Sequence, residues 1–244
     1  MISYYNINSL RNKILDIQDI VSKTMPDVLV LAETKLDDQF SKTQFYLNQY
    51  YEPTRKDYTK NSGGLIEYVR NGLIRKRLPE FELKDFESIT SELTINKEKW
   101  LILSFYRTER NENRLSNINK FFLELSQILD KIISKYDNII LMGDINIDLN
   151  SKSSVGHKEF NNFMDLYNLS NLIKTPTCHF KGNSSSIDII LTNKPRRFFH
   201  SDSFELGVSD YHSLVTSFLR THISRLKPIT SHTDLLKTLT LKIF

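Results

Sequence analysis

The sequence predicts an α/β fold: a four-layered sandwich of two mixed, mainly antiparallel sheets flanked by helices. Short runs rich in Val, Ile, Leu and aromatic residues recur along the chain and often fall in antiparallel pairs. Only a few segments between them repeat apolar residues at helical spacing. Strands that outnumber helices in this way bury their apolar faces when two sheets stack and helices cover the outside.

The composition is that of an ordinary globular protein of 244 residues. Its 33 basic and 29 acidic residues give a net charge of +4, which is compatible with a polyanionic partner. Cys178 is the only cysteine, which excludes an intrachain disulfide and a zinc site built from several cysteines. The chain has neither a secretory signal nor an apolar run of membrane-spanning length. We expect an intracellular protein, nuclear or cytoplasmic, that is not secreted and does not act on membranes.

The first two predicted strands each carry polar side chains at their ends. Residues 2–8 alternate loosely and put Asn6 and Asn8 on one face. Residues 27–32 form a nearly continuous apolar strand that runs into Glu33. The stretch between these strands predicts a helix, capped by Ser9, whose buried stripe consists of Leu10, Ile14, Ile17 and Val21.

The middle of the chain predicts two antiparallel strand pairs and a long helix. Residues 65–70 and 73–77 flank the Asn71-Gly72 dipeptide, a strong signal for a hairpin. Residues 87–96 and 100–106 form the second pair. A helix begins at Ser116 and has one broad apolar face, made of Ile118, Phe121, Phe122, Leu125, Ile128, Leu129 and Ile132.

Residues 139–148 read IILMGDINID, an apolar run that leaves the core at a glycine and is followed by Asp144 and Asn146. A carboxylate and a carboxamide on a rigid strand end suit a hard divalent cation and a phosphate oxygen. A strand followed by an ordinary Asp/Asn turn is the alternative interpretation. A short helix over residues 158–167 and a turn-rich loop over residues 175–186 come next.

The last two predicted strands span residues 187–191 and 214–219. The first carries Asp188 among isoleucines, and a buried aspartate is costly unless it is paired or ligated. Asp210 and His212 precede the second strand and would share a face in extended backbone.

Polar residues at or near the predicted strand ends form one candidate site. Several strand ends of a sandwich meet at one rim, so we expect these side chains to lie together. They are Asn6, Asn8, Glu33, Tyr106, Asp144, Asn146, Asp188, Asp210 and His212. We assign residues 1–220 to one domain and residues 221–244, which show no clear periodicity, to a tail or the start of a missing linker.

Seven segments in order resemble the endonuclease/exonuclease/phosphatase superfamily: YYNINSL, LAETKL, SGGLIEYVRNGL, SFYR, LMGDINID, SSIDIILTN and GVSDYHSLV. The resemblance covers roughly residues 2–220. A single piece such as GDIN is a weak signal, but the ordered set is specific. The stretches TPTC, IDIILTNKPRRF and GVSDYHSLV make the chain most similar to the apurinic-type endonuclease domain of non-LTR (LINE-like) retrotransposons.

The resemblance implies a metal-binding and a phosphate-binding group. Glu33 matches the principal metal ligand, and Asn8 would lie near the metal. Asn6 and Asn146 would contact the phosphate, and Tyr106 would help to orient it. Many relatives have Asp where this chain has Asn8, so Glu33 would carry more of the metal's charge and metal binding could be weaker.

The resemblance also implies acid–base residues. Asp144 matches the residue that positions or activates the attacking water, Asp188 the aspartate of the ID strand, and Asp210 the aspartate of an Asp-His pair. The family usually has His directly after that Asp, whereas Tyr211 follows here and His212 comes next. Either His212 reaches the site and pairs with Asp210, or Tyr211 occupies the histidine position and activity is reduced or lost.

The resemblance implies Mg²⁺-dependent hydrolysis of a phosphodiester, with Mn²⁺ as an alternative metal. DNA is the expected partner, and a nick leaving a 3′ hydroxyl would prime reverse transcription in a retrotransposon. We expect the protein to be a monomer. Its expected partner in a retrotransposon is a reverse transcriptase domain, which is absent from this chain.

Two other classes of function stay open. One is a catalytically impaired remnant that still binds nucleic acid, which the Tyr211 departure favours. The other is a phosphodiesterase or phosphatase for other phosphate esters, because one fold supports several substrates.

Overall fold

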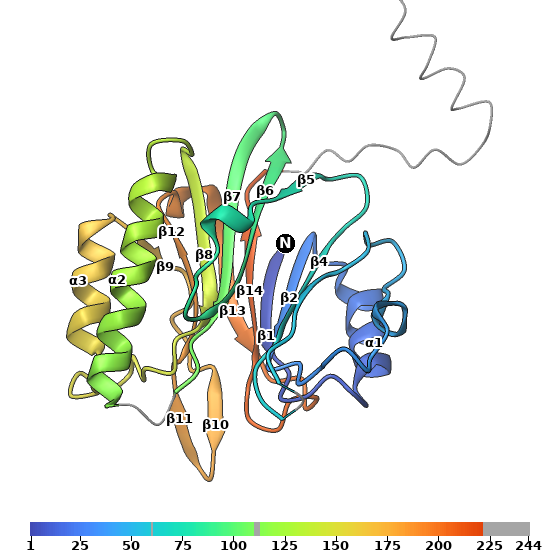
Figure 1. Cartoon of the computed structure of the whole chain (residues 1–244), viewed down its shortest axis with the longest axis horizontal. Helices are drawn as coiled ribbons and strands as arrows, with labels where there is room; N and C mark the ends of the chain where they lie inside the picture. Colours follow the sequence, from blue (N-terminus) through green and yellow to red (C-terminus); the bar gives the residue numbers. More distant parts are fainter. Residues whose placement is uncertain (60, 110–112, 222–244) are drawn as a thin grey trace, which may run out of the picture.

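The computed structural model describes residues 1–59, 61–109 and 113–221 and confirms the predicted fold class. Two six-stranded mixed sheets stack on each other (Figure 1). One helix, α1, lies outside the first sheet, and α2 and α3 lie side by side outside the second (Figure 1). Most of the predicted tail, residues 222–244, lies outside the described residues.

The first sheet has the order β13-β14-β1-β2-β4-β3. Its strands are β1 (Ile2–Asn6), β2 (Val28–Ala32), β3 (Thr54–Lys56), β4 (Leu65–Val69), β13 (Phe198–Phe204) and β14 (Leu214–Leu219). β1 is parallel to β2 and antiparallel to β14. Helix α1 (Ile14–Thr24) buries Ile17 and Val21 in an apolar cluster with residues of β1, β2 and β4.

The second sheet has the order β5-β6-β7-β8-β12-β9. Its strands are β5 (Ile74–Arg77), β6 (Glu87–Ile95), β7 (Glu98–Tyr106), β8 (Asn138–Asp144), β9 (Ser170–Asn171) and β12 (Asp188–Thr192). Only β7 and β8 run parallel, and the other pairs are antiparallel. The helices α2 (Arg114–Ile132) and α3 (His157–Leu166) pack their aromatic residues against its outer face.

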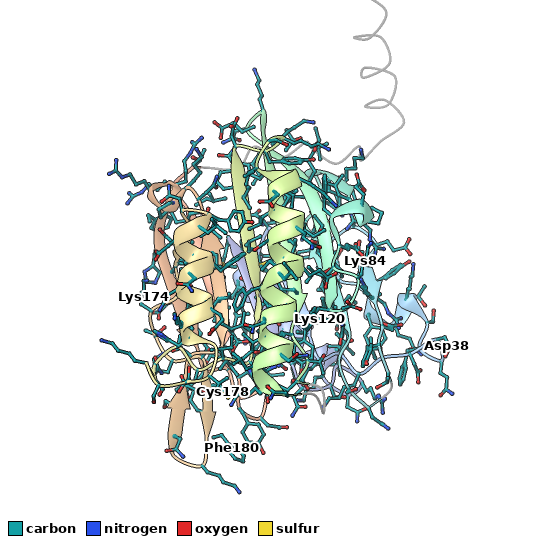
Figure 2. The ribbon with its side chains drawn as sticks, turned by 60° about the vertical axis from the view of Figure 1, so that its left-hand side comes forward. Asp38, Lys84, Lys120, Lys174, Cys178 and Phe180 are labelled. Atoms are coloured by element: carbon teal, nitrogen blue, oxygen red, sulfur yellow. The ribbon has the colours of Figure 1, made fainter. Side chains whose placement is uncertain are left out.

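Three short 3₁₀ helices and a small hairpin complete the fold. The 3₁₀ helices are η1 (Lys42–Phe45), η2 (Pro79–Phe81) and η3 (Pro195–Arg197). The hairpin of β10 (Cys178–Phe180) and β11 (Asn183–Ser185) extends away from the sheets, with Phe180 further out than Cys178 (Figures 1 and 2). This hairpin occupies part of the segment predicted as a turn-rich loop.

The predicted hairpin around Asn71-Gly72 is wrong. Both strands exist, but β4 pairs with β2 and β3, whereas β5 pairs with β6 in the other sheet. The turn therefore carries the chain from one sheet to the other. Gly72 still has the left-handed φ of 88° that the turn requires.

Two helix starts also differ from the prediction. The first helix begins at Ile14, because the backbone N–H groups of Ser9 and Leu10 are bonded to the carbonyls of Glu33 and Thr34. The long helix begins at Arg114, where the side chain of Asn113 accepts hydrogen bonds from the first turn.

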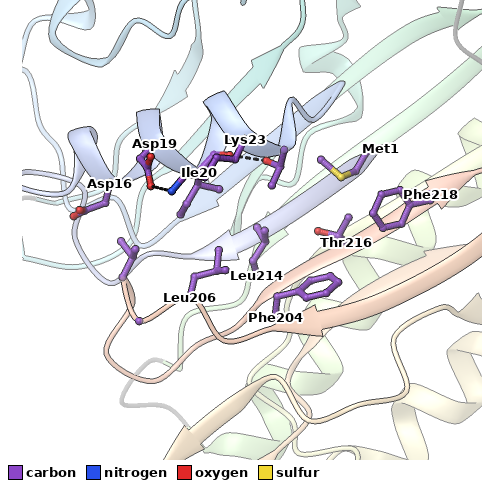
Figure 3. A pocket seen from close by; sticks show the side chains of 13 residues that line it. Met1, Asp16, Asp19, Ile20, Lys23, Phe204, Leu206, Leu214, Thr216 and Phe218 are labelled. Carbon is purple, nitrogen blue, oxygen red and sulfur yellow. Dashed lines mark hydrogen bonds and ion pairs between the residues drawn. The ribbon is translucent and has the colours of Figure 1, made fainter.

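An apolar cavity of about 580 Å³ lies between α1 and the strands β13 and β14 (Figure 3). Phe204, Leu206 and Leu214 line it, with Asp16 and Asp19 of α1 at one side. None of the nine predicted site residues belongs to its described lining. Among the described residues, no helix is long and apolar enough to cross a membrane.

Candidate active site

The strands β1, β2, β7 and β8 end at the same edge of the sandwich, beside the β10–β11 hairpin (Figure 1). Asn6 ends β1, Tyr106 ends β7 and Asp144 ends β8, while Glu33 directly follows β2. Parallel pairing in each sheet brings these ends into register, with Asn6 beside Ala32 and Tyr106 beside Asp144.

Asn6 connects the two sheets at this edge. Its Nδ2 donates to Glu33 Oε1 at 2.9 Å and to Asp144 Oδ2 at 3.1 Å. Tyr106 donates its hydroxyl to the same Glu33 oxygen at 2.8 Å. Asn6 is fully buried, so its amide holds the two carboxylates in fixed relative positions.

Two close contacts fix the backbone on either side of the Gly143–Asp144 peptide bond. Gly143 has no room for a side chain, because a Cβ there would overlap the carbonyl oxygen and the ring of Phe105 on β7. The hydroxyl of Tyr4 on β1 accepts from the Asp144 backbone N–H at 3.0 Å and donates to the Phe105 carbonyl at 3.3 Å. Sequence reasoning identified neither contact, since the first depends on which strand pairs with β8 and the second on the packing of one sheet on the other.

Arg107 fixes the turn that carries Asn146. Its guanidinium is completely buried and donates to the carbonyls of Ile145 at 2.5 Å and Asn146 at 3.1 Å, and to the side chain of Asn117 at 2.5 Å. In return, Asn146 Nδ2 donates to the Arg107 carbonyl at 2.8 Å. Sequence reasoning gave Arg107 no role, although an arginine directly after the strand-ending tyrosine was visible.

His212 pairs with Asp188 and not with Asp210, which corrects the expected pair. His212 Nδ1 lies 3.3 Å from Asp188 Oδ2. The chain bends from residue 207 to residue 211, so the extended backbone that would align Asp210 with His212 is absent. Asp210 is exposed and accepts a 2.8 Å hydrogen bond from Asn8 Nδ2.

Tyr211 packs on the β10–β11 hairpin. Its side chain is 43% exposed and packs edge-on against Phe180 of the β10–β11 hairpin, with ring centroids 4.8 Å apart. His212 itself forms a β-bridge with Cys178. The extra tyrosine therefore lies on the hairpin side, while the imidazole of His212 faces the acidic residues.

Burial and mutual repulsion change the protonation of this site. Burial, and then the neighbouring Asp188 carboxylate, raise the pKa of Asp144 to about 7. Burial alone would lower the pKa of His212, but its bond to Asp188 and the charges of Asp144 and Glu33 raise it to about 9. At neutral pH the site therefore holds an imidazolium and an aspartate that protonates readily.

Glu87 is a site neighbour that sequence reasoning missed. It begins β6 opposite Tyr106 and accepts hydrogen bonds from the Gly64 backbone N–H and, at 3.2 Å, from the Thr108 hydroxyl. Burial raises the pKa of Glu87 to about 7. Gly63 and Gly64 in turn accept from the backbone of Lys35 and Thr34, so Glu87 supports the segment next to Glu33.

The donor set suits a divalent cation. Ligand atoms of Glu33, Asp144 and His212 lie within 4.8 Å of one another. Carboxylate oxygens suit Mg²⁺ and Mn²⁺, whereas His212 could add a nitrogen ligand only in its neutral form, because an imidazolium has no free lone pair. The oxygen of Asn8, the other predicted ligand, accepts a hydrogen bond from Lys35.

A two-sheet sandwich with carboxylates, amides and a histidine gathered at one edge defines an architecture that nucleases and phosphatases share. The chain belongs to the Endonuclease/Exonuclease/phosphatase family, whose profile matches residues 3–210. Exodeoxyribonuclease III of Haemophilus influenzae is 26% identical over 149 residues, which are 59% of this chain. The chain spans only 56% of the length of that relative.

Solved structures with the same fold include several proteins of DNA metabolism. The 3′ phosphatase NExo from Neisseria, bound to a product DNA hairpin, has a TM-score of 0.73 at 17% identity and covers 90% of this chain and 99% of its own. The AP endonuclease LMAP from Leishmania major has a TM-score of 0.75 at 14% identity, covering 91% and 87%. The endonuclease domain of TRAS1, a telomere-specific non-LTR retrotransposon, has a TM-score of 0.72 at 11% identity, covering 91% and 98%.

Proposed function

We propose that this chain is a divalent-metal-dependent endonuclease that nicks DNA by hydrolysing a phosphodiester bond. The observation that carries the proposal is the convergence of Glu33, Asp144 and His212, whose ligand atoms lie within 4.8 Å of one another. The family and its DNA-processing relatives support the same class of substrate. The fold of the TRAS1 domain supports nicking for retrotransposition as the finer assignment.

Four polar side chains divide the chemistry among them. Asp144, which is buried and has a pKa raised to about 7, accepts a proton from the attacking water. His212, protonated at neutral pH, donates a hydrogen bond to the phosphate oxygens as their charge grows. Asn6 and Tyr106 keep Glu33 and Asp144 in place and orient the phosphate.

Glu33 would hold Mg²⁺ or Mn²⁺, with the Asp144 carboxylate as the adjacent donor and the protonated His212 beside them. The bound cation would supply positive charge for the phosphoryl oxygens and the leaving 3′ oxygen. Asn146 would contact the phosphate, and Asp188 would keep His212 oriented through its Nδ1.

The test is nicking of supercoiled plasmid with Mg²⁺, with EDTA and Asp144→Ala as controls. We expect metal-dependent nicking that Asp144→Ala reduces by about 100-fold or more. Because Tyr211 packs on Phe180, Tyr211→His should not be needed for activity.

A folded wild type that binds DNA without nicking it, with or without Tyr211→His, would refute the enzymatic proposal and leave the nucleic-acid-binding remnant. Release of phosphate from a 3′-phosphorylated oligonucleotide, without plasmid nicking, would instead indicate a phosphatase. Both assays use the same folded protein, so their combined results distinguish an endonuclease, a phosphatase and a remnant that only binds nucleic acid.

A further inference from the structure

The ammonium group of Lys35 lies inside the candidate site, next to the proposed metal ligand. Lys35 Nζ is 3.6 Å from Glu33 Oε2 and donates a 2.5 Å hydrogen bond to Asn8 Oδ1. The side chains of Lys35 and Glu33 are 24% and 20% exposed, so water screens the pair only partly. A fixed positive charge therefore already occupies part of the space beside Glu33.

The main chain of Lys35 is held at both of its polar groups. Its N–H donates to the Gly63 carbonyl at 2.9 Å, and its carbonyl accepts from Arg11 Nε at 2.8 Å. Glu33 and Lys35 both have left-handed backbone, with φ of 50° and 53°. The ammonium of Lys35 lies beside the carboxylate of Glu33 on this backbone.

The two oxygens of Glu33 have different partners. Oε1 accepts hydrogen bonds from Asn6 and Tyr106, whereas Oε2 is the oxygen near Lys35. A carboxylate oxygen has about two lone pairs, so the bonds from Asn6 and Tyr106 occupy Oε1. A cation bound by Glu33 would then use Oε2, the oxygen that Lys35 approaches.

Asn8 adds no negative charge to balance Lys35, so Glu33 alone does so among the described residues within 4.0 Å. Asn8 is neutral and accepts from Lys35 through its oxygen, while its Nδ2 is bound to Asp210 at 2.8 Å. Within the described parts of the chain, Glu33 is the only carboxylate within 4.0 Å of the Lys35 ammonium. Any metal ion bound at Glu33 would therefore be repelled by Lys35.

We propose that Lys35 is an internal cation that competes with the divalent metal ion for Glu33 Oε2 and so weakens metal binding by the DNA-free protein. The inference rests on the proposed function, because it concerns the metal of the same site. It assigns Lys35 a positioning role: the residue sets how tightly Glu33 binds a cation.

The test measures Mn²⁺ binding to the DNA-free chain by electron paramagnetic resonance. Lys35→Met removes the charge and keeps the length of the side chain, and should tighten the Mn²⁺ Kd about five- to tenfold. Lys35→Arg, which keeps the charge, should stay within about twofold of wild type. Lys23→Met removes an exposed lysine on α1 and is the matched control for net charge, with no expected change.

Lys35→Gln provides a second variant. It removes the same charge with a polar side chain and should also tighten Mn²⁺ binding, whereas an added carboxylate at position 8 would tighten it whatever Lys35 does. It keeps the inference testable if Lys35→Met does not fold, which thermal denaturation would reveal.

Equal or weaker Mn²⁺ binding by folded Lys35→Met would overturn the inference. The inference would also be overturned if Lys35→Met lost DNA affinity while its Mn²⁺ Kd stayed at the wild-type value, since Lys35 would then be a phosphate contact. Failure of the wild type and every variant to bind Mn²⁺ would instead refute the metal-dependent function itself, and the inference would fall with it.

Discussion

His212 is a partly buried imidazole whose charge depends on its neighbours. Burial disfavours the imidazolium, yet the bond to Asp188 and the charges of Asp144 and Glu33 raise the pKa of His212 to about 9. The residue is therefore a cationic hydrogen-bond donor at neutral pH. Its partner Asp188 is more deeply buried, and Asp188 Oδ1 has no hydrogen-bond partner among the described residues.

Asp188→Asn should move the alkaline limit of nicking to lower pH. The substitution removes the main interactions that raise the pKa of His212, so the imidazolium loses its proton at least about one pH unit earlier. The measurement is kcat/KM as a function of pH, with Asp19→Asn on α1 as the control. An unchanged alkaline limb would show that His212 does not act as the protonated donor.

Tyr211 and His212 should differ sharply when each is replaced by alanine. His212→Ala should reduce nicking by about 100-fold or more, because it removes a charged donor from the site. Tyr211→Ala should keep nicking within about threefold of wild type, because that side chain packs on Phe180. Comparable losses in the two folded variants would contradict this division.

Sequence reasoning named nine site residues, and the structure brings all of them to the same edge. Seven of them surround the carboxylates: Asn6, Glu33, Tyr106, Asp144, Asn146, Asp188 and His212. Asn8 joins them through its backbone N–H, which donates to Asn6 Oδ1 at 3.2 Å, and its side chain binds Asp210. The pairing of His212 could not be predicted, because alternation along a strand says nothing about a bent segment.

At the scale of elements, Arg107 links three segments: the end of β7, the turn after β8 and helix α2. The end of β7 carries it, the turn after β8 receives its hydrogen bonds, and Asn117 of α2 accepts another. Because the Arg107 guanidinium is fully buried, its positive charge is stabilised by these hydrogen-bond acceptors and not by water. The turn bearing Asn146 is thus tied to the helix that covers the sheet.

Arg107→Leu should destabilise the protein by roughly 3 kcal/mol, because several buried acceptors lose their donor. Arg114→Leu is a matched control: Arg114 also donates to the Asn146 carbonyl, but its side chain is 51% exposed. We expect Arg114→Leu to cost less than about 1 kcal/mol. Urea denaturation of both variants measures the difference, and equal costs would contradict the prediction.

Elements with a buried, periodic apolar face were predicted well, and exposed or sheet-crossing ones were not. β6, β7 and β14 match their predicted positions within a few residues. β13 was missed because most of its residues are exposed or half-buried, so it shows no apolar alternation. The Asn71-Gly72 turn was assigned to a hairpin because local turn chemistry does not reveal which sheet the next strand joins.

At the scale of the whole molecule, three groups with raised pKa values give stability the same pH dependence. Burial raises the pKa of Asp144 and of Glu87 to about 7, and the pKa of His212 is raised to about 9. Each group binds its proton more tightly in the folded chain than in the unfolded chain. Stability therefore falls as pH rises, through pH 4–7 for the acids and through about pH 6.5–9 for His212.

Asp144→Asn should stabilise the metal-free protein while abolishing nicking. Asparagine resembles the protonated acid, so the gain should grow with pH, reaching about 1–2 kcal/mol at pH 8 and less at pH 5. Urea denaturation in EDTA at the two pH values measures it. A gain that is equal at both values, or a loss at pH 8, would contradict the proposed cost of ionising Asp144.

The pairing of β1 with β14 has a consequence for synthesis on the ribosome. Asn8 and Asp210 are hydrogen bonded although 202 positions separate them, and β1 lacks one of its two neighbouring strands until β14 has been made. His212 is also among the last site residues to be translated. A nascent chain that has exposed Asn6, Glu33 and Asp144 therefore still lacks the assembled site, so cutting activity should begin only after release of almost the whole domain.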